Sequence, residues 1–200
     1  MMKKQLLKLL IVFIFLITAT ACGKGAKSMD DFILSKEPTN FVRLEMVSGQ
    51  QLIIELYPDV TPITVANFKK LVAAKFYDGL IFHRVINNFM IQTGDPLGNG
   101  TGGSAQTIKG EFTSNGVTNN LSHTKGIVSM ARKGNDNNSA SSQFFICQAN
   151  VPNLDGSYAA FGKVIVGLEI VDQIAQVKTD ENDKPLIPQK IKTIVFVKAK

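Results

Sequence analysis

The 200-residue sequence contains no tryptophan, only two cysteines and only two histidines. Cys22 and Cys147 are too few to build the framework of a disulfide-rich domain, and we expect no disulfide between them. His83 and His123 are too few for a typical zinc site without cysteine ligands, and no HExxH motif occurs. We therefore expect no metal ion and no organic cofactor.

Motifs for nucleotide binding and for serine hydrolysis are also missing or out of context. No Gly-Lys-Ser/Thr sequence completes a P-loop, and no G-x-S-x-G elbow occurs. Residues 98–103 match G-x-G-x-x-G, but they follow the turn Asp95-Pro96 instead of a buried strand, and residues 104–109 do not read as a helix. We interpret this segment as a tight surface loop. The basic residues are scattered, which predicts no nucleic-acid binding.

The first 21 residues have the layout of a secretory signal peptide. Lys3 and Lys4 precede an apolar run over residues 6–21 that is broken only by Lys8 and ends in small residues before Cys22. The run is too short and too poorly flanked for a good membrane span. Its end resembles a bacterial lipoprotein cleavage site, so we expect Cys22 to be lipidated. This predicts anchoring to the cell membrane on its extracytoplasmic face. An ordinary secreted protein and an uncleaved anchor remain alternatives.

The rest of the chain divides into a tether and one domain. Residues 22–39 mix small, polar and charged residues without periodicity and are expected to be a flexible tether. Residues 40–200 are long enough for one domain with a substantial core. Three of the 22 basic residues lie in the signal peptide, so the remainder carries 19 basic against 16 acidic residues, a net charge of +3.

Periodicity predicts the first elements of this domain. Residues 41–46 alternate between apolar and polar, and residues 51–57 do so in part, which indicates an antiparallel hairpin around a turn at Ser48-Gly49. Thr61 and Pro62 suit the N-cap and first position of a helix. Apolar residues then recur at helical spacing until Asp78-Gly79 ends the stretch.

The remaining pattern favours a mainly β structure. Residues 80–161 consist of short apolar pieces separated by Gly, Asn, Asp and Ser, which is typical of short strands. Residues 144–147 predict a buried strand in which Cys147 is a small apolar side chain. A second helix is predicted over residues 167–177 and a last strand over residues 191–197. Together these predict a β-barrel with two packed helices.

The segment 82–95 carries the most informative chemistry. On strands, Phe82 and Arg84 would share one face, and Met90 and Gln92 would share another. An arginine among large apolar residues must reach solvent or serve a partner. From spacing alone, an ordinary ion pair at a sheet edge is the favoured interpretation of Arg84.

Eight short segments together resemble the cyclophilin family of peptidyl-prolyl isomerases. They follow the order of the family and extend the resemblance over residues 41–198. The segments are 82–85, 89–92, 94–95, 100–103, 126–131, 142–146, 154–156 and 161–164. The resemblance implies a closed eight-stranded antiparallel β-barrel capped by two α-helices, with a groove for Xaa-Pro peptides.

The resemblance also assigns roles to residues. It implies that Arg84 is catalytic. It further implies that the substrate-binding residues are Phe89, Met90, Gln92, Ala131, Gln143, Phe145, Leu154 and Tyr158. Tyr158 stands where the best-known members have histidine, and Asn153 stands where they have a tryptophan that contacts cyclosporin. We therefore expect weak cyclosporin binding.

The function implied is peptidyl-prolyl cis-trans isomerisation of exported proteins by a monomeric folding catalyst. The expected partners are Xaa-Pro-containing polypeptides and, through the lipid anchor, the membrane. One alternative is a proline-peptide binder or chaperone with this fold but little activity. A solute-binding lipoprotein is another, but a single barrel pattern fits poorly with two lobes around a ligand.

Overall fold

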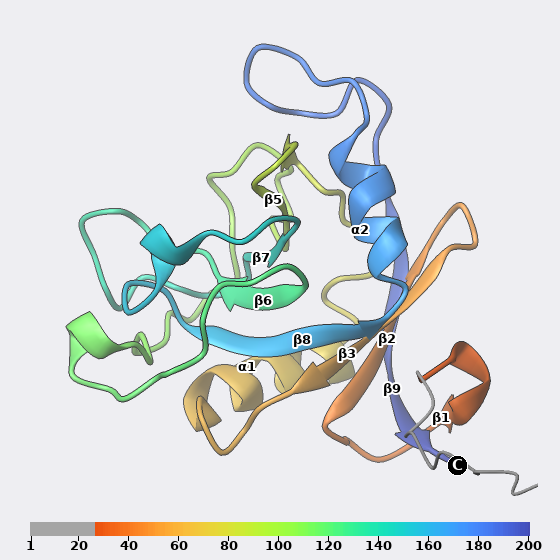
Figure 1. Cartoon of the computed structure of the whole chain (residues 1–200), viewed down its shortest axis with the longest axis horizontal. Helices are drawn as coiled ribbons and strands as arrows, with labels where there is room; N and C mark the ends of the chain where they lie inside the picture. Colours follow the sequence, from red (N-terminus) through yellow and green to blue (C-terminus); the bar gives the residue numbers. More distant parts are fainter. Residues whose placement is uncertain (1–26) are drawn as a thin grey trace, which may run out of the picture.

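The computed structural model describes residues 27–200, so the predicted signal peptide 1–21 and the lipidation site Cys22 lie outside the described part. Two α-helices and nine strands form a mainly β fold (Figure 1). The helices are α1 (Pro62–Ala73) and α2 (Leu168–Ala175). The strands are β1 (Phe32–Leu34), β2 (Phe41–Met46), β3 (Gln51–Leu56), β4 (Arg84–Ile86), β5 (Met90–Thr93), β6 (Ile127–Met130), β7 (Phe144–Cys147), β8 (Ala160–Val166) and β9 (Ile191–Ala199). The predicted hairpin, both helices, the strand 144–147 and the last strand are confirmed. Neither helix within residues 27–200 is long and apolar enough to cross a membrane.

The strands form one antiparallel sheet in the order β1-β9-β2-β3-β8-β6-β7-β5-β4. A closed eight-stranded barrel is not confirmed, because the sheet has nine strands and no strand ladder within the described residues joins β4 to the other end. The chain before β4 meets the start of β9 through an isolated bridge between Ile81 and Lys190 and a few backbone hydrogen bonds, such as that from the Phe82 N–H to the Gln189 carbonyl at 2.9 Å. The physical reason is that β4 has three residues, and the loop at Asp183 occupies its outer edge, where the Val85 N–H donates to the Asp183 carbonyl at 2.8 Å.

The ninth strand comes from the segment expected to be a flexible tether. In this segment, β1 pairs with the end of β9, with Phe32 opposite Ala199 and Leu34 opposite Val197. The Thr39 hydroxyl also donates a hydrogen bond to the carbonyl of Val197 in β9. The sheet therefore begins eight residues before the predicted start of the domain, at Phe32 instead of Asn40.

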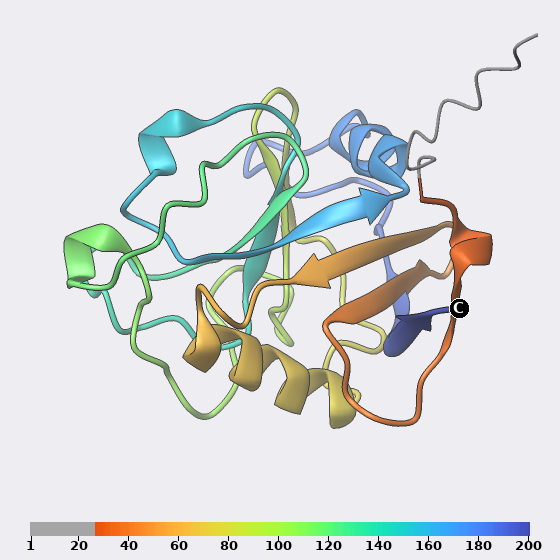
Figure 2. The same ribbon diagram turned by 60° about the horizontal axis from the view of Figure 1, so that its bottom comes forward.

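The main core lies inside the curved sheet and is covered by both helices. Figures 1 and 2 show α1 and α2 at opposite ends of the curved sheet. Phe68 of α1 is fully buried and packs edge-on against Phe144 of β7, with ring centroids 5.5 Å apart. Val171 of α2 is also fully buried in this core.

The N-terminus of α1 begins at Pro62 as predicted, but Thr61 does not cap it through its side chain. A helix leaves its first backbone N–H groups without partners. The carboxylate of Glu111 accepts from the Ile63 N–H at 3.0 Å and from the Thr64 N–H at 2.7 Å. Glu111 is 2% exposed, so a distant acidic residue replaces the expected local cap.

A second, smaller apolar cluster lies on the outer face of β5, β6 and β7. Alternate residues of a strand point to opposite faces of the sheet. Ile91 and Ile146 therefore join the main core, whereas Met90, Phe145 and Cys147 join the outer cluster. This outer cluster forms the base on which the candidate site is built.

Candidate active site

Strand register aligns three predicted site residues across the sheet. Arg84 of β4 is opposite Gln92 of β5, and Gln92 is opposite Phe145 of β7. Residues directly opposite one another in an antiparallel sheet point to the same face. The three side chains therefore stand in a row on the outer face, although Phe145 is 61 positions after Arg84 in the sequence.

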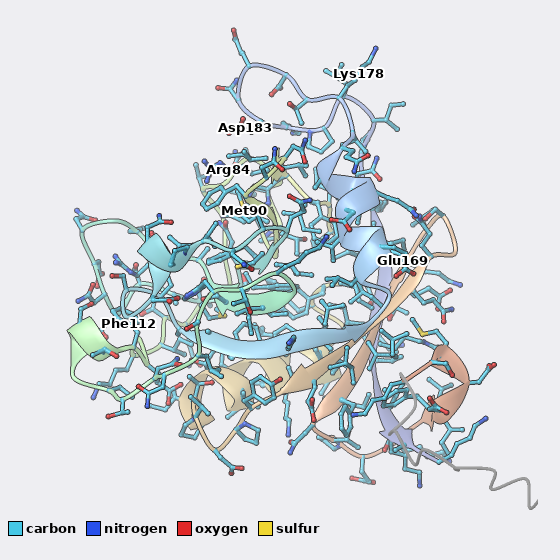
Figure 3. All side chains as sticks on the ribbon, in the orientation of Figure 1. Arg84, Met90, Phe112, Glu169, Lys178 and Asp183 are labelled. Atoms are coloured by element: carbon cyan, nitrogen blue, oxygen red, sulfur yellow. The ribbon has the colours of Figure 1, made fainter. Side chains whose placement is uncertain are left out.

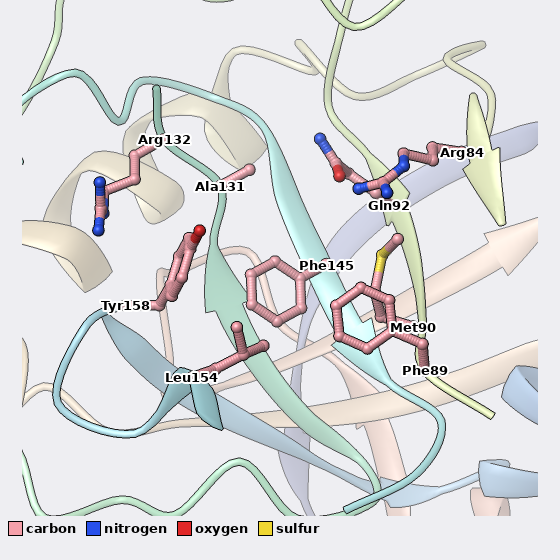
Figure 4. A pocket seen from close by; sticks show the side chains of 9 residues that line it. All are labelled: Arg84, Phe89, Met90, Gln92, Ala131, Arg132, Phe145, Leu154 and Tyr158. Atoms are coloured by element: carbon pink, nitrogen blue, oxygen red, sulfur yellow. The ribbon is translucent and has the colours of Figure 1, made fainter. Parts of the chain in front are cut away.

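These side chains border a pocket of about 190 Å³. Figure 4 shows Phe145 at its centre, Arg84 and Gln92 on one side, and Tyr158 and Arg132 on the other. The complete lining consists of Arg84, Phe89, Met90, Gln92, Ala131, Arg132, Phe145, Leu154 and Tyr158. The structure thus brings together all the predicted catalytic and substrate-binding residues except Gln143, and it adds Arg132.

Phe145 is the buried aromatic wall of the pocket, with 5% of the residue exposed. Its ring stacks on His123 with centroids 6.0 Å apart and meets Tyr158 edge-on at 5.9 Å. Tyr158 therefore continues the apolar wall in the position where the resemblance expected a histidine. Asn153 is exposed and does not line the pocket.

A buried polar network lies behind Phe145. One ring nitrogen of His123, Nδ1, lies 2.8 Å from Asp155, and the other, Nε2, lies 3.0 Å from the Ser129 hydroxyl. Burial lowers the pKa of His123, and the nearby Asp155 carboxylate only partly offsets this effect. Burial alone would raise the pKa of Asp155, but the hydrogen bonds from the His123 backbone and ring lower it overall. A neutral histidine therefore supports the Phe145 ring at neutral pH.

Arg132, which follows Ala131 in the sequence, also lines the pocket. Its Nε donates to the Ser157 carbonyl at 3.0 Å, and its Nη1 donates to the carbonyls of Lys133 and Gly134. The guanidinium carbon lies 4.8 Å from the centre of the Tyr158 ring. Arg132 thus holds the outer side of Tyr158 through cation–π contact.

Gln143 lies in a neighbouring hollow of about 660 Å³ instead of the first pocket. Its side-chain carbonyl accepts from Gln92 Nε2 at 2.8 Å, and its own Nε2 donates to the carbonyls of Gly100 and Gly102. The two hollows share Gln92, Ala131 and Arg132. Gln143 therefore fixes the side chain of Gln92 and joins the pocket to the glycine-rich loop.

Arg84 carries the charge on the open side of the pocket. Its side chain is 45% exposed, and its Nε lies 3.4 Å from Asp183 Oδ2. The ion pair expected from spacing alone therefore exists, but it occurs at the rim of an apolar pocket. Its partner is 99 positions away and was not predicted from the sequence.

The arrangement suits a small apolar ring flanked by amide groups. The pocket offers apolar walls, and Arg84 and Gln92 supply hydrogen-bond donors along one side. The thiol of Cys147 lies below, where burial first and Asp155 second raise its pKa to about 12, so it offers no thiolate nucleophile near neutral pH.

Comparisons with known proteins agree with this geometry. A family model described as cyclophilin type peptidyl-prolyl cis-trans isomerase/CLD matches residues 41–195. The peptidyl-prolyl cis-trans isomerase ppi1 of Schizosaccharomyces pombe is 44% identical over 151 residues, which are 75% of this chain and 94% of that protein. The peptidyl-prolyl cis-trans isomerase-like 1 of Rhizopus delemar is 48% identical over 139 residues, or 69% of this chain and 82% of that protein.

A solved structure provides the third comparison. The crystal structure of a cyclophilin type peptidyl-prolyl cis-trans isomerase of Cryptosporidium parvum, in the presence of the dipeptide Ala-Pro, is 35% identical in sequence. It superimposes with a TM-score of 0.71 and covers 78% of this chain and 97% of the other.

Proposed function

This chain belongs to the cyclophilin-type family and is a peptidyl-prolyl cis-trans isomerase, and from that premise we propose that Arg84 is its catalytic residue. The observation that carries the proposal is the row of Arg84, Gln92 and Phe145 beside the apolar pocket. In this assignment the prolyl ring is enclosed by apolar side chains, those of Phe145, Phe89, Met90 and Leu154. Gln92 binds the peptide backbone of the substrate.

The chemistry requires weakening of one partial double bond. Rotation about an amide bond is opposed by a barrier of roughly 18–20 kcal/mol. In the twisted state the prolyl nitrogen becomes pyramidal and its lone pair can accept a hydrogen bond. The Arg84 guanidinium donates to that nitrogen, an interaction that is stronger in the transition state than in either planar ground state. About 4 kcal/mol of such stabilisation accelerates the reaction roughly a thousandfold.

The pocket contributes by holding one side of the bond still. When the prolyl ring is enclosed, the carbonyl group before it is the part that turns. Ala131 and Tyr158 complete the enclosure, and Gln143 orients Gln92 through the 2.8 Å hydrogen bond. No step in this mechanism needs a nucleophile, a metal ion or an organic cofactor.

Substitution of Arg84 tests the assignment. We expect Arg84→Ala to lower kcat/KM for a prolyl tetrapeptide roughly a hundredfold or more, as loss of a charge-stabilising donor does in other enzymes. Because the side chain is 45% exposed, the fold should remain intact. The measurement is a protease-coupled or NMR exchange assay on the purified domain, with circular dichroism as the control for folding. An Arg84→Ala variant with the normal rate would refute this role.

We further propose that the clients are exported proteins and that the enzyme is a lipoprotein on the extracytoplasmic face of the cell membrane. The support is the signal-peptide layout of residues 1–21 followed by Cys22. We expect Cys22→Ser to release the protein from the membrane fraction and to abolish labelling with radioactive palmitate. A variant that remains membrane-bound and labelled would contradict the proposal.

Two binding properties complete the proposal. We expect a monomer, and we expect weak cyclosporin binding because Asn153 replaces the tryptophan of well-known relatives and is exposed outside the pocket. Sedimentation and calorimetric titration with cyclosporin measure these two properties.

A further inference from the structure

Asp183 lies on the loop between α2 and β9, directly beside Arg84 at the rim of the pocket (Figure 3). Its carboxylate oxygen Oδ2 lies 3.4 Å from Arg84 Nε, and the two side chains are 42% and 45% exposed. Ion pairs this exposed contribute little to folding stability. A gain in folding stability therefore does not explain why a carboxylate lies beside Arg84.

The backbone of Asp183 is held in an unfavourable conformation. Its φ is +62°, in the left-handed region, where the Cβ atom of an ordinary residue is crowded. The Asp180 carboxylate supports this turn by accepting from the backbone N–H groups of Asn182 and Lys184, each at 2.9 Å. The turn is further closed by a hydrogen bond from the Asp180 N–H to the Lys184 carbonyl at 2.8 Å.

This turn is fastened to the strand that carries Arg84. The N–H of Val85, the next residue in β4, donates to the Asp183 carbonyl at 2.8 Å. On the other side, Lys184 Nζ donates to the Gly98 carbonyl at 3.0 Å, and Pro185 is buried. The backbone of Asp183 is therefore fixed relative to the backbone of Arg84 by contacts that do not involve the Arg84 side chain, and this places the Asp183 carboxylate beside the guanidinium.

We infer that Asp183 is a positioning residue for the Arg84 guanidinium, an inference that rests on the proposed catalytic role of Arg84. An arginine side chain has many rotamers, and its planar guanidinium addresses a substrate only in a defined orientation. The contact with Asp183 engages Nε and leaves Nη1 and Nη2 for the substrate. The carboxylate thus aims the guanidinium at the pocket before the peptide binds.

Two substitutions separate this role from a structural one. Glycine is favoured at a φ of +62°, so Asp183→Gly preserves the turn while it removes the carboxylate. Asparagine tolerates the same φ and keeps an oxygen that can accept from Nε, so Asp183→Asn preserves both the turn and the contact. Glu181→Gln is the matched control, because it removes a negative charge from an exposed position in the same turn.

We expect Asp183→Gly to lower kcat by roughly five- to fiftyfold with KM within about twofold of wild type, because a misaligned catalytic group loses transition-state interactions first. Asp183→Asn should retain most of the wild-type kcat, and Glu181→Gln should match wild type. In NMR spectra, the Arg84 Nε proton should exchange with water faster in Asp183→Gly than in wild type.

The results distinguish this inference from the proposed function. If Arg84→Ala is inactive but Asp183→Gly keeps the wild-type kcat, the positioning role is wrong and the proposed function stands. Equal losses in Asp183→Gly and Asp183→Asn would also overturn it, since they would show that charge and not orientation matters. If Arg84→Ala is fully active, the proposed function itself fails. In the Arg84→Ala background, Asp183→Gly should cause no further loss.

Discussion

Replacement of Phe145 by alanine tests whether the outer cluster supports the pocket independently of the main core. Phe145 is 5% exposed, and its ring contacts His123 and Tyr158. Truncation of a buried phenylalanine costs about 3–5 kcal/mol of unfolding free energy. We expect a value near the lower limit, about 3 kcal/mol, because one side of the ring already faces the 190 Å³ pocket and water can enter the space that is left.

The predicted loss corresponds to a fall in melting temperature of roughly 6–12 °C, since a domain of this size loses about 2–4 °C for each kcal/mol. Activity should also decline, because the ring is a wall for the bound proline. Burial of each CH₂ group contributes about 0.8 kcal/mol of binding free energy. Exposure of two or three such groups of the prolyl ring should therefore lower kcat/KM roughly ten- to fiftyfold.

Ile146→Val is the matched control for this experiment. Ile146 is adjacent in β7 but points into the main core, where it is fully buried. This change should cost about 0.5–1.5 kcal/mol and leave kcat/KM unaltered. The assays are thermal unfolding followed by circular dichroism, and peptide isomerisation at a temperature where both variants are folded. If Phe145→Ala keeps full activity, or if Ile146→Val loses as much activity, the assignment of the two faces is wrong.

Three further predictions follow from buried groups outside the pocket. Glu111→Gln should lower the unfolding free energy by about 1–3 kcal/mol without changing kcat/KM, because a charged acceptor of α1 N–H groups is lost. A variant with the wild-type midpoint in denaturant unfolding would contradict this prediction. Burial lowers the pKa of His123 and of His83, so below the ordinary value of 6.5 the unfolded chain takes up protons that the folded chain excludes. The unfolding free energy should therefore keep this contribution in full above pH 6.5 and decrease as the pH falls below 6.5. An increase in unfolding free energy between pH 6.5 and 5.5 would contradict the prediction. Burial raises the pKa of Cys147 to about 12, so in a Cys22→Ser background the native protein should not react with a thiol reagent at pH 8 until denaturant is added; rapid labelling of native protein would refute it.

Much of the fold was predictable because it depends on local patterns. Alternation identified the hairpin of β2 and β3, and helical spacing identified α1, since each needs only neighbours in the chain. The pocket residues were found through the family resemblance. Strand register then explains why they meet, because Arg84, Gln92 and Phe145 lie opposite one another.

The contacts that were missed all join distant parts of the chain. Glu111 caps a helix 47 positions before it, and Asp183 reaches Arg84 across 99 positions. No local pattern in the sequence encodes such pairs. The left-handed backbone of Asp183 was also not predicted, because only a small fraction of residues other than glycine adopt it. The closed eight-stranded barrel expected from the resemblance was not confirmed, because β4 has three residues and the loop at Asp183 occupies its outer edge.

If Cys22 carries the proposed lipid, the pairing of β1 with β9 limits the distance between the enzyme and the membrane. A free segment over residues 22–39 would have a fully extended reach of about 60 Å. Because the described structure begins its first turn at Met29, the seven residues 22–28 can span at most about 25 Å. With the proposed lipid on Cys22, catalysis is then confined to a thin layer at the membrane surface. Under the same proposal, the enzyme would act on exported polypeptides at the membrane surface.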